Sequence, residues 1–171
     1  QHNVTLAPGE TKTIDYLISL SGPEPQRSML ENTLMTQLAP LSGNIVVTLG
    51  KTETVTKTKS RNITTYSSVS RTTRENLLNK AKLVIARSGY TTIMDLAVVG
   101  TKALLIPTPG QIEQEYLAAY HQDLRQFAAA TQHTVDFARD IGRVKATTGI
   151  TKTHSVNTAV EQILDIVTQR A

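Results

Sequence analysis

Short apolar runs alternate with longer segments of helical periodicity along most of this chain. The apolar runs are rich in Ile, Val and Leu, and they predict strands at residues 14–20, 45–49, 63–66, 83–86 and 103–106, with a last strand at 134–137. A continuous apolar run is typical of a strand that is buried on both faces of a parallel sheet, whereas a strand with one solvated face alternates. The pattern therefore predicts a sheet with both faces covered.

Between these runs, apolar residues recur at three- and four-residue steps, which is the spacing of one helix face. The predicted helices lie at residues 25–38, 74–80, 91–99, 112–130 and 157–169. Turn-forming residues agree with these ends, because Pro40 and Gly43 follow the first helix and Gly100 follows the third. The Lys- and Thr-rich segment 51–60 is expected to be a loop, and residues 138–156 carry no clear pattern.

The alternation of strands and helices predicts the α/β class, as a three-layer, Rossmann-like domain whose mostly parallel sheet has helices on both faces. The chain has 171 residues, a length that suits one domain with a sizeable core. No internal repeat or hinge segment divides it, so residues 1–171 are expected to form a single domain.

The composition of the chain argues against several classes of functional site. The chain has no cysteine, so disulfides and thiolate metal sites are excluded. Its four histidines stand apart without the spacing of metal ligands, and neither a metal nor a cofactor is expected. The 18 basic residues exceed the 14 acidic ones only slightly and are spread along the chain, and aromatic residues make up 4%. A nucleic-acid partner is therefore not expected.

Ligands of open α/β sheets bind beyond the carboxyl ends of the strands, and three predicted loops lie at that edge. The first loop contains Ser21, Gly22 and Arg27 between a strand and a helix. Glycine lets the backbone approach a ligand, and a helix N-terminus attracts anions. The alternative interpretation is a simple strand-to-helix turn with a solvated Arg27.

The second loop enters a helix, and its candidate site residues are Arg87, Ser88, Gly89, Thr91, Thr92 and Asp95. Hydroxyls and free N–H groups gather at the start of the helix, where a phosphate could bind. A carboxylate one turn into such a helix, here Asp95, could accept both hydroxyls of a ribose. The alternative is structural, because Thr92 and Asp95 also form a pattern that resembles a helix capping box. Both interpretations can hold at once.

The third loop carries amides and carboxylates just after a strand, and its candidates are Gln111, Gln114 and Glu115. Such side chains suit sugar hydroxyls, although acidic residues are also common at the start of a helix. Because three loops of this kind are expected on one edge of one sheet, the sequence favours a nucleotide-sugar site there.

Residues 81–97, Gly100, residues 103–107 and residues 114–116 together resemble the C-terminal domain of family 28 glycosyltransferases. The similarity extends more weakly to residues 20–27 and 47–51. The resemblance implies a GT-B donor domain in which the diphosphate lies at Ser88 and Gly89. Several positions depart from the family pattern: the departure at Asp95 affects the geometry of the ribose contact, and those at Glu115 and in the first loop leave the sugar and the substrate open. Asp95 stands where the family usually has a ribose-binding glutamate, Glu115 stands at the second position of a Gln-Gln pair, and residues 21–23 replace a glycine-rich loop.

The resemblance further implies a function. This chain is expected to bind the UDP-sugar donor of a hexosyl or N-acetylhexosaminyl transfer, while the acceptor is held by an N-terminal domain absent from this chain or by a partner chain. Isolated, the domain is expected to be inactive. Two alternatives stay open: a stand-alone binding subunit that needs a membrane-bound partner, and a nucleotide-sugar hydrolase domain. The expected location is the cytoplasm, with peripheral association of the full enzyme at the inner face of the membrane.

Overall fold

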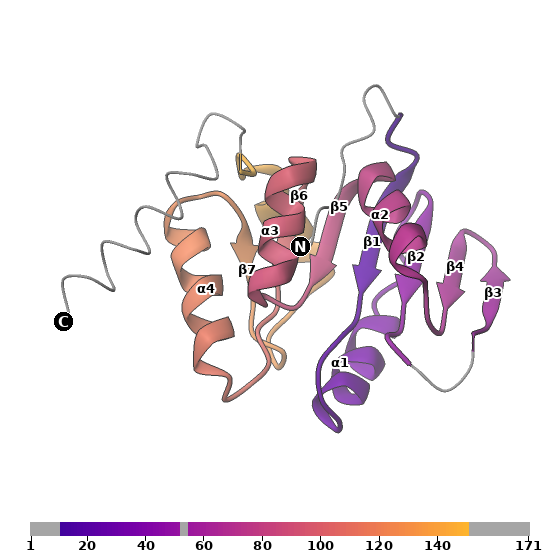
Figure 1. Ribbon diagram of the computed structural model, residues 1–171, viewed down its shortest axis with the longest axis horizontal. Helices are drawn as coiled ribbons and strands as arrows, with labels where there is room; N and C mark the ends of the chain where they lie inside the picture. Colours follow the sequence, from indigo (N-terminus) through magenta and orange to yellow (C-terminus); the bar gives the residue numbers. More distant parts are fainter. Residues whose placement is uncertain (1–10, 52–54, 151–171) are drawn as a thin grey trace.

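The computed structural model describes residues 11–51 and 55–150, which form a three-layer α/β domain (Figure 1). The strands are β1 (Ile14–Ser19), β2 (Ile45–Thr48), β3 (Lys57–Ser60), β4 (Ile63–Tyr66), β5 (Ala81–Ala86), β6 (Lys102–Leu105) and β7 (Ala128–Ala129). The helices are α1 (Gln26–Met35), α2 (Arg71–Lys80), α3 (Tyr90–Val99), α4 (Ile112–Asp123) and α5 (Phe137–Lys145). The helix predicted at residues 157–169 lies outside the described residues, as do His2 and His154.

The strands form one sheet in the order β3-β4-β2-β1-β5-β6-β7. Every neighbouring pair is parallel except β3 and β4. In the register of the central strands, Ser19 lies opposite Thr48 on one side and Ala86 on the other, and Ala86 lies opposite Leu105. The strands β1, β5 and β6 therefore end together, and the loops that follow them leave from one edge, which we call the carboxyl edge.

The core has two layers because the sheet is covered on both faces. On one face, Leu30 and Leu34 of α1 pack in one cluster with Phe137 of α5. On the other face, Leu96 of α3 is fully buried in a cluster that also includes side chains of α2 and α4. Burial of each large apolar side chain contributes about 1.5–3 kcal/mol. Among the described residues, no helix is long and apolar enough to cross a membrane.

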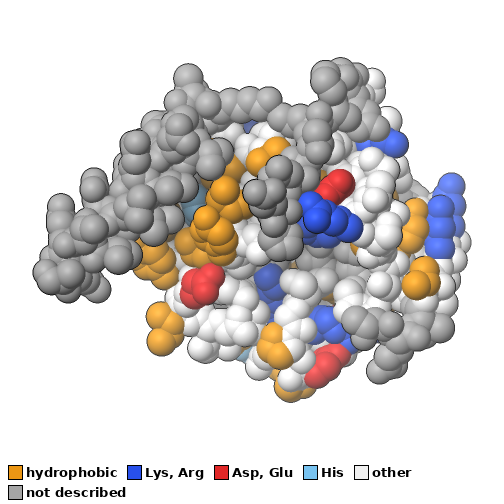
Figure 2. Space-filling view, viewed as in Figure 1, with side chains coloured by type: hydrophobic (Ala, Val, Ile, Leu, Met, Phe, Trp, Pro, Cys, Tyr) orange, Lys and Arg blue, Asp and Glu red, His pale blue; other side chains and the backbone are white. Residues whose placement is uncertain are grey.

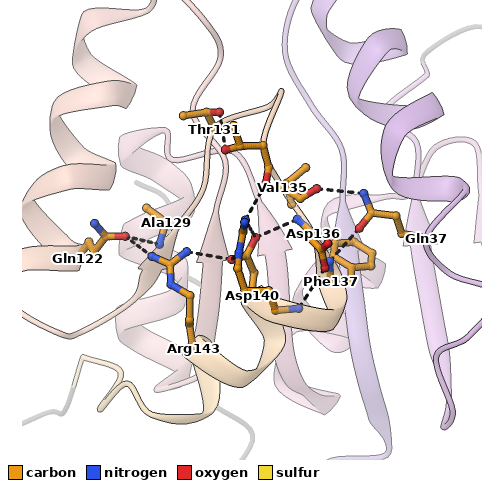
Figure 3. A network of polar contacts seen from close by, with 11 residues as sticks. Gln37, Gln122, Ala129, Thr131, Val135, Asp136, Phe137, Asp140 and Arg143 are labelled. Carbon is orange, nitrogen blue, oxygen red and sulfur yellow. Dashed lines mark hydrogen bonds and ion pairs between the residues drawn. The ribbon is translucent and has the colours of Figure 1, made fainter.

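A polar network anchors α5 (Figure 3). Asp140 is fully buried and accepts hydrogen bonds from Arg139, Arg143 and the backbone N–H of Asp136, at 2.8–2.9 Å. Burial raises the pKa of Asp140, but hydrogen bonds from Arg139, the Asp136 backbone and Arg143 outweigh it, so the pKa lies below its ordinary value. Gln37, which lies just after the end of α1, bonds to the backbone on both sides of Asp136. These contacts fix α5 against α1.

Most predicted elements are present, but two predictions at the sheet edges were wrong. Residues 51–60 were expected to be a loop, whereas Lys57–Ser60 form β3. All of its side chains are exposed, so the strand has no apolar signal. The last strand was predicted at 134–137, whereas the last strand of the described chain is β7 and Phe137 begins α5.

The helix predicted at 112–130 is shorter than expected, because α4 ends at Asp123. Arg125 adopts a left-handed backbone conformation with φ 54°, which cannot continue an α-helix. The chain then turns inward so that Phe127, which is fully buried, enters the core. The apolar residues after Asp123 therefore belong to this turn and to β7, although their composition continued the helical pattern.

Candidate functional site

Arg87 lies at the centre of the carboxyl edge, directly after β5, and only 2% of it is exposed. Its guanidinium donates hydrogen bonds to the carbonyl oxygens of Gln26 and Pro107, both at 3.0 Å, and to Oε1 of Gln132 at 2.6 Å. Burial lowers the pKa of Arg87 to about 10, so the side chain stays charged at neutral pH. Arg87 thus connects the start of α1 to the third loop through these hydrogen bonds. A contact between Arg87 and a ligand stays a prediction.

The first and third loops meet at Gly22, which has a φ of 109°. A Cβ atom there would lie 3.5 Å from Oγ1 of Thr108 and 3.8 Å from Nε of Arg87. The positive φ favours glycine at this position, whereas both distances would be ordinary van der Waals contacts for a Cβ atom. Oγ1 of Thr108 is buried and has no hydrogen-bond partner in the part of the chain that the structure describes. Sequence reasoning did not identify Thr108.

The N-terminus of α3 is open toward the carboxyl edge. Gly89 is its N-cap residue and supplies no side-chain hydrogen bond, and a Cβ atom at Gly89 would meet no heavy atom within 4 Å. The first N–H groups of a helix have no partner within it, and within residues 11–51 and 55–150 those of Tyr90, Thr91 and Thr92 find none elsewhere. Free donors and the positive end of the helix dipole together suit an anion.

Ser88 connects the second loop to the third. Its hydroxyl is fully buried and donates to the carbonyl oxygen of Gln114 at 2.7 Å. The Gln114 side chain accepts from the backbone N–H of Thr108 at 3.0 Å and donates to the side chain of Gln111. Oε1 of the exposed Glu115 accepts a hydrogen bond from the backbone N–H of Gly110, in the same loop, at 2.9 Å. The predicted sugar-binding side chains therefore also hold the third loop in shape.

Asp95 lies in the second turn of α3, and its side chain is only 6% exposed. Its Oδ2 accepts a hydrogen bond from Nη1 of Arg74, a residue of α2, at 2.5 Å. The carboxylate predicted to hold a ribose is therefore already paired on one oxygen. Sequence reasoning missed Arg74, because the two residues are 21 positions apart on different helices and no spacing connects them.

Arg27 is buried in α1 and is neutralised by its neighbours. Its guanidinium pairs with Glu24 and, at 3.0 Å, with Glu31, and it donates to the carbonyl oxygen of Leu49 at 3.1 Å. Ser21, in contrast, is exposed at the rim of the carboxyl edge. The structure thus brings Ser21 and Gly22 to the same edge as the second and third loops, while the charge of Arg27 is compensated within its own helix and turn.

The outer face of α4 differs from the polar loops beside it. Hydrophobic side chains lie on the surface on the side of the molecule where α4 runs (Figure 2). Those exposed on or next to α4 recur every four residues: Ile112, Tyr116, Tyr120 and Leu124. The rings of Tyr116 and Tyr120 stack with centroids 6.0 Å apart. This stripe starts next to Gln111, so an apolar surface borders the candidate site on one side.

Comparison with known protein families gives a match over most of the described chain. Residues 29–135 match the glycosyltransferase family 28 C-terminal domain, which is more than half of the 171 residues. The match includes the second and third loops with the start of α3. Ser21, Gly22 and Arg27 of the first loop precede it.

Curated relatives with sequence similarity come from Methylobacterium and Methylorubrum species. They share one name, UDP-N-acetylglucosamine--N-acetylmuramyl-(pentapeptide) pyrophosphoryl-undecaprenol N-acetylglucosamine transferase. The protein of Methylobacterium sp. (strain 4-46) is 50% identical over 38 residues, which are 22% of this chain and 10% of the relative. The protein of Methylobacterium radiotolerans is 26% identical over 102 residues, 52% of this chain and 27% of the relative. The chain therefore spans only a minor part of these relatives.

Solved structures confirm the fold. MurG of Acinetobacter baumannii superposes with a TM-score of 0.58 at 15% identity, over 83% of this chain and 44% of that chain. The solution structure of ALG13 gives a TM-score of 0.60 at 8% identity, over 81% of this chain and 90% of that one. The three-layer domain predicted from the alternation of strands and helices is therefore present.

Proposed function

Because this chain belongs to the glycosyltransferase family 28 C-terminal domain, we propose that its carboxyl edge binds the UDP-sugar donor of a hexosyl or N-acetylhexosaminyl transfer. The observation that carries the proposal is the open N-terminus of α3 at the junction of three loops. A diphosphate there would accept hydrogen bonds from the free N–H groups of Tyr90, Thr91 and Thr92, with the exposed Thr91 hydroxyl beside them.

The ribose and the sugar of the donor would contact residues of α3 and of the third loop. Asp95 has one oxygen paired with Arg74, and the second oxygen is the proposed acceptor for ribose hydroxyls. The third loop presents Gln111, Gln114 and Glu115 to the sugar. Support for the sugar position comes from the contacts of Ser88 and Gln114, which hold the third loop against the start of α3.

The reaction that this site would serve is displacement at the anomeric carbon. An acceptor hydroxyl oxygen attacks that carbon, the bond from carbon to the diphosphate oxygen breaks, and the diphosphate leaves with the electron pair. The negative charge that develops on the leaving group lies where α3 directs its N–H groups and its dipole, so the helix lowers the barrier as well as binding the ground state. We propose that the acceptor and the base are supplied by an N-terminal domain or a partner chain, at the inner face of the cytoplasmic membrane.

A substitution at Gly89 tests the diphosphate position without disturbing the fold. Gly89 has φ −67° and ψ 148°, which other residues adopt readily, and a Cβ atom meets nothing within 4 Å. Gly89→Asp would place a carboxylate on the free N–H groups, as an N-cap aspartate does, and stabilise the helix by about 0.5–1 kcal/mol. We expect it to weaken UDP binding at least ~30-fold in calorimetry, because the carboxylate occupies and repels the phosphate position.

Gly89→Asn is the neutral counterpart and should weaken UDP binding less than Gly89→Asp. Gly142→Asp adds the same charge to α5, where a Cβ atom also meets nothing within 4 Å, and should leave UDP affinity unchanged. UDP affinity that survives Gly89→Asp would place the diphosphate elsewhere.

A further inference from the structure

We propose that Arg74 is a positioning residue for the nucleoside end of the ligand: it holds one oxygen of the Asp95 carboxylate through an ion pair and leaves the second oxygen for the ribose hydroxyls. The inference rests on the proposed function, since it assumes that a nucleoside diphosphate binds at the carboxyl edge. It adds a residue from α2, a helix in which the sequence showed no candidate for the site.

The placement of the two residues supports this role. Arg74 is near the start of α2 (Arg71–Lys80), and Asp95 is in the second turn of α3 (Tyr90–Val99). Both helices follow parallel strands, so both begin at the carboxyl edge. They pack on the same face of the sheet, and the contact between Nη1 and Oδ2 at 2.5 Å joins them.

Burial gives this contact its importance. The Asp95 side chain is 6% exposed and that of Arg74 is 36% exposed. A buried carboxylate is unfavourable unless a cation or hydrogen-bond donors compensate it. Among the described residues, Arg74 is the one side chain that donates to Asp95. Without Arg74, no side chain of the described residues would hold the Asp95 carboxylate in place.

The pair also has unused hydrogen-bonding capacity. Within the described chain, Oδ1 of Asp95 accepts no hydrogen bond, and the Arg74 guanidinium forms no hydrogen bond or ion pair other than that of Nη1. A carboxylate oxygen that accepts from a hydroxyl forms a shorter and stronger bond than a neutral acceptor does. We therefore expect Arg74 to affect affinity mainly through the ribose, and only weakly through the phosphates.

The test compares the affinities of the chain for UDP and 2′-deoxy-UDP, measured by calorimetry. The chain should bind UDP about tenfold or more tightly than 2′-deoxy-UDP, the size expected for one hydrogen bond to a charged group. Arg74→Met should reduce this ratio to about twofold or less, with the affinity for 2′-deoxy-UDP within about threefold of the original. Arg74→Lys retains the cation and should restore most of the ratio.

Arg71→Met is the matched control, because Arg71 belongs to the same helix but bonds to Glu75 at 2.9 Å with its side chain 61% exposed. It should leave the ratio unchanged. If Arg74→Met fails to fold by circular dichroism, the double variant Arg74→Met with Asp95→Asn buries no unpaired charge. Because Arg74 acts through Asp95, this variant should show the same ratio of affinities as Asp95→Asn alone, and a different ratio would overturn the inference.

Each other outcome overturns the inference in a recognisable way. An unchanged ratio in a folded Arg74→Met variant would show that Arg74 only stabilises the helix interface. Equal binding of UDP and 2′-deoxy-UDP by the unmodified chain would show that Asp95 does not bind the ribose hydroxyls, whereas the proposed diphosphate site at the start of α3 would survive. Absence of UDP binding by the unmodified chain would overturn both.

Discussion

Asp140 in α5 and Asp95 in α3 are both buried aspartates paired with arginine, but their surroundings differ. Both oxygens of Asp140 are used: Oδ1 accepts from Arg139 and Arg143, and Oδ2 accepts from Arg139 and the backbone N–H of Asp136 (Figure 3). Within the described residues, Asp95 receives one hydrogen bond on one oxygen. The two sites also lie on opposite faces of the sheet.

The difference separates a structural carboxylate from one that is available to a ligand. A buried acid with all its acceptor positions filled can hold secondary structure together but has nothing left for an incoming hydroxyl. Asp95 retains an oxygen that accepts no hydrogen bond within the described chain, and it lies in the second turn of the helix that begins after Gly89. Burial and an arginine partner alone would not distinguish the two residues, whereas the number of filled acceptor positions does.

The largest expected effect is on stability at Asp140. Asp140→Asn should lower the free energy of unfolding by about 3 kcal/mol, because the donors of Arg139 and Arg143 lose a charged acceptor. Urea denaturation at pH 7 measures this. Binding of UDP to the folded variant should be unchanged, since α5 contributes no residue to the candidate site.

The pH dependence of stability sharpens this result. The pKa of Asp140 lies below its ordinary value in the folded chain, so its contribution is complete above the ordinary carboxyl pKa of about 3.9 and is lost as the pH falls through the folded pKa. The stability advantage of the unmodified chain over Asp140→Asn should therefore shrink below about pH 4. A constant difference from pH 7 to pH 3 would contradict the assigned pairing.

A smaller loss of stability is expected at Asp95, where the effect on binding should dominate. Asp95→Asn keeps the size of the side chain, and the partner Arg74 is partly exposed and can turn to water. We expect the free energy of unfolding to fall by only about 1 kcal/mol, while UDP affinity falls about tenfold through the ribose. If instead stability falls as much as in Asp140→Asn and UDP affinity does not change, the two aspartates have the same structural role.

The sequence predicted the centre of the sheet better than its edges. The runs that became β1, β2 and β5 are mostly apolar, because helices cover both faces of these strands, and their register brings the predicted loops together. The edge strand β3 has only exposed side chains, and β7 has two residues, so neither carries a pattern that periodicity could detect.

The candidate site was predictable in part for the same reason. Gly89 and the start of α3 follow a buried strand, so their place at the carboxyl edge followed from the fold. The place of Arg74 could not be predicted in this way, because its contact with Asp95 depends on how α2 and α3 pack together. One available signal was missed: Phe137, Ile141 and Val144 recur at helical spacing after the capping residue Asp136, and they form the buried face of α5.

The most direct test of the account follows the backbone amides of the isotope-labelled chain by NMR during titration with UDP. The largest chemical-shift changes should occur at Gly89, Tyr90, Thr91 and Thr92, with smaller changes around Arg74 and Asp95 and none in α5. Changes confined to the opposite edge of the sheet, near Lys82 and Lys102, or unshifted amides at the start of α3 under saturating UDP, would contradict a diphosphate site at this helix.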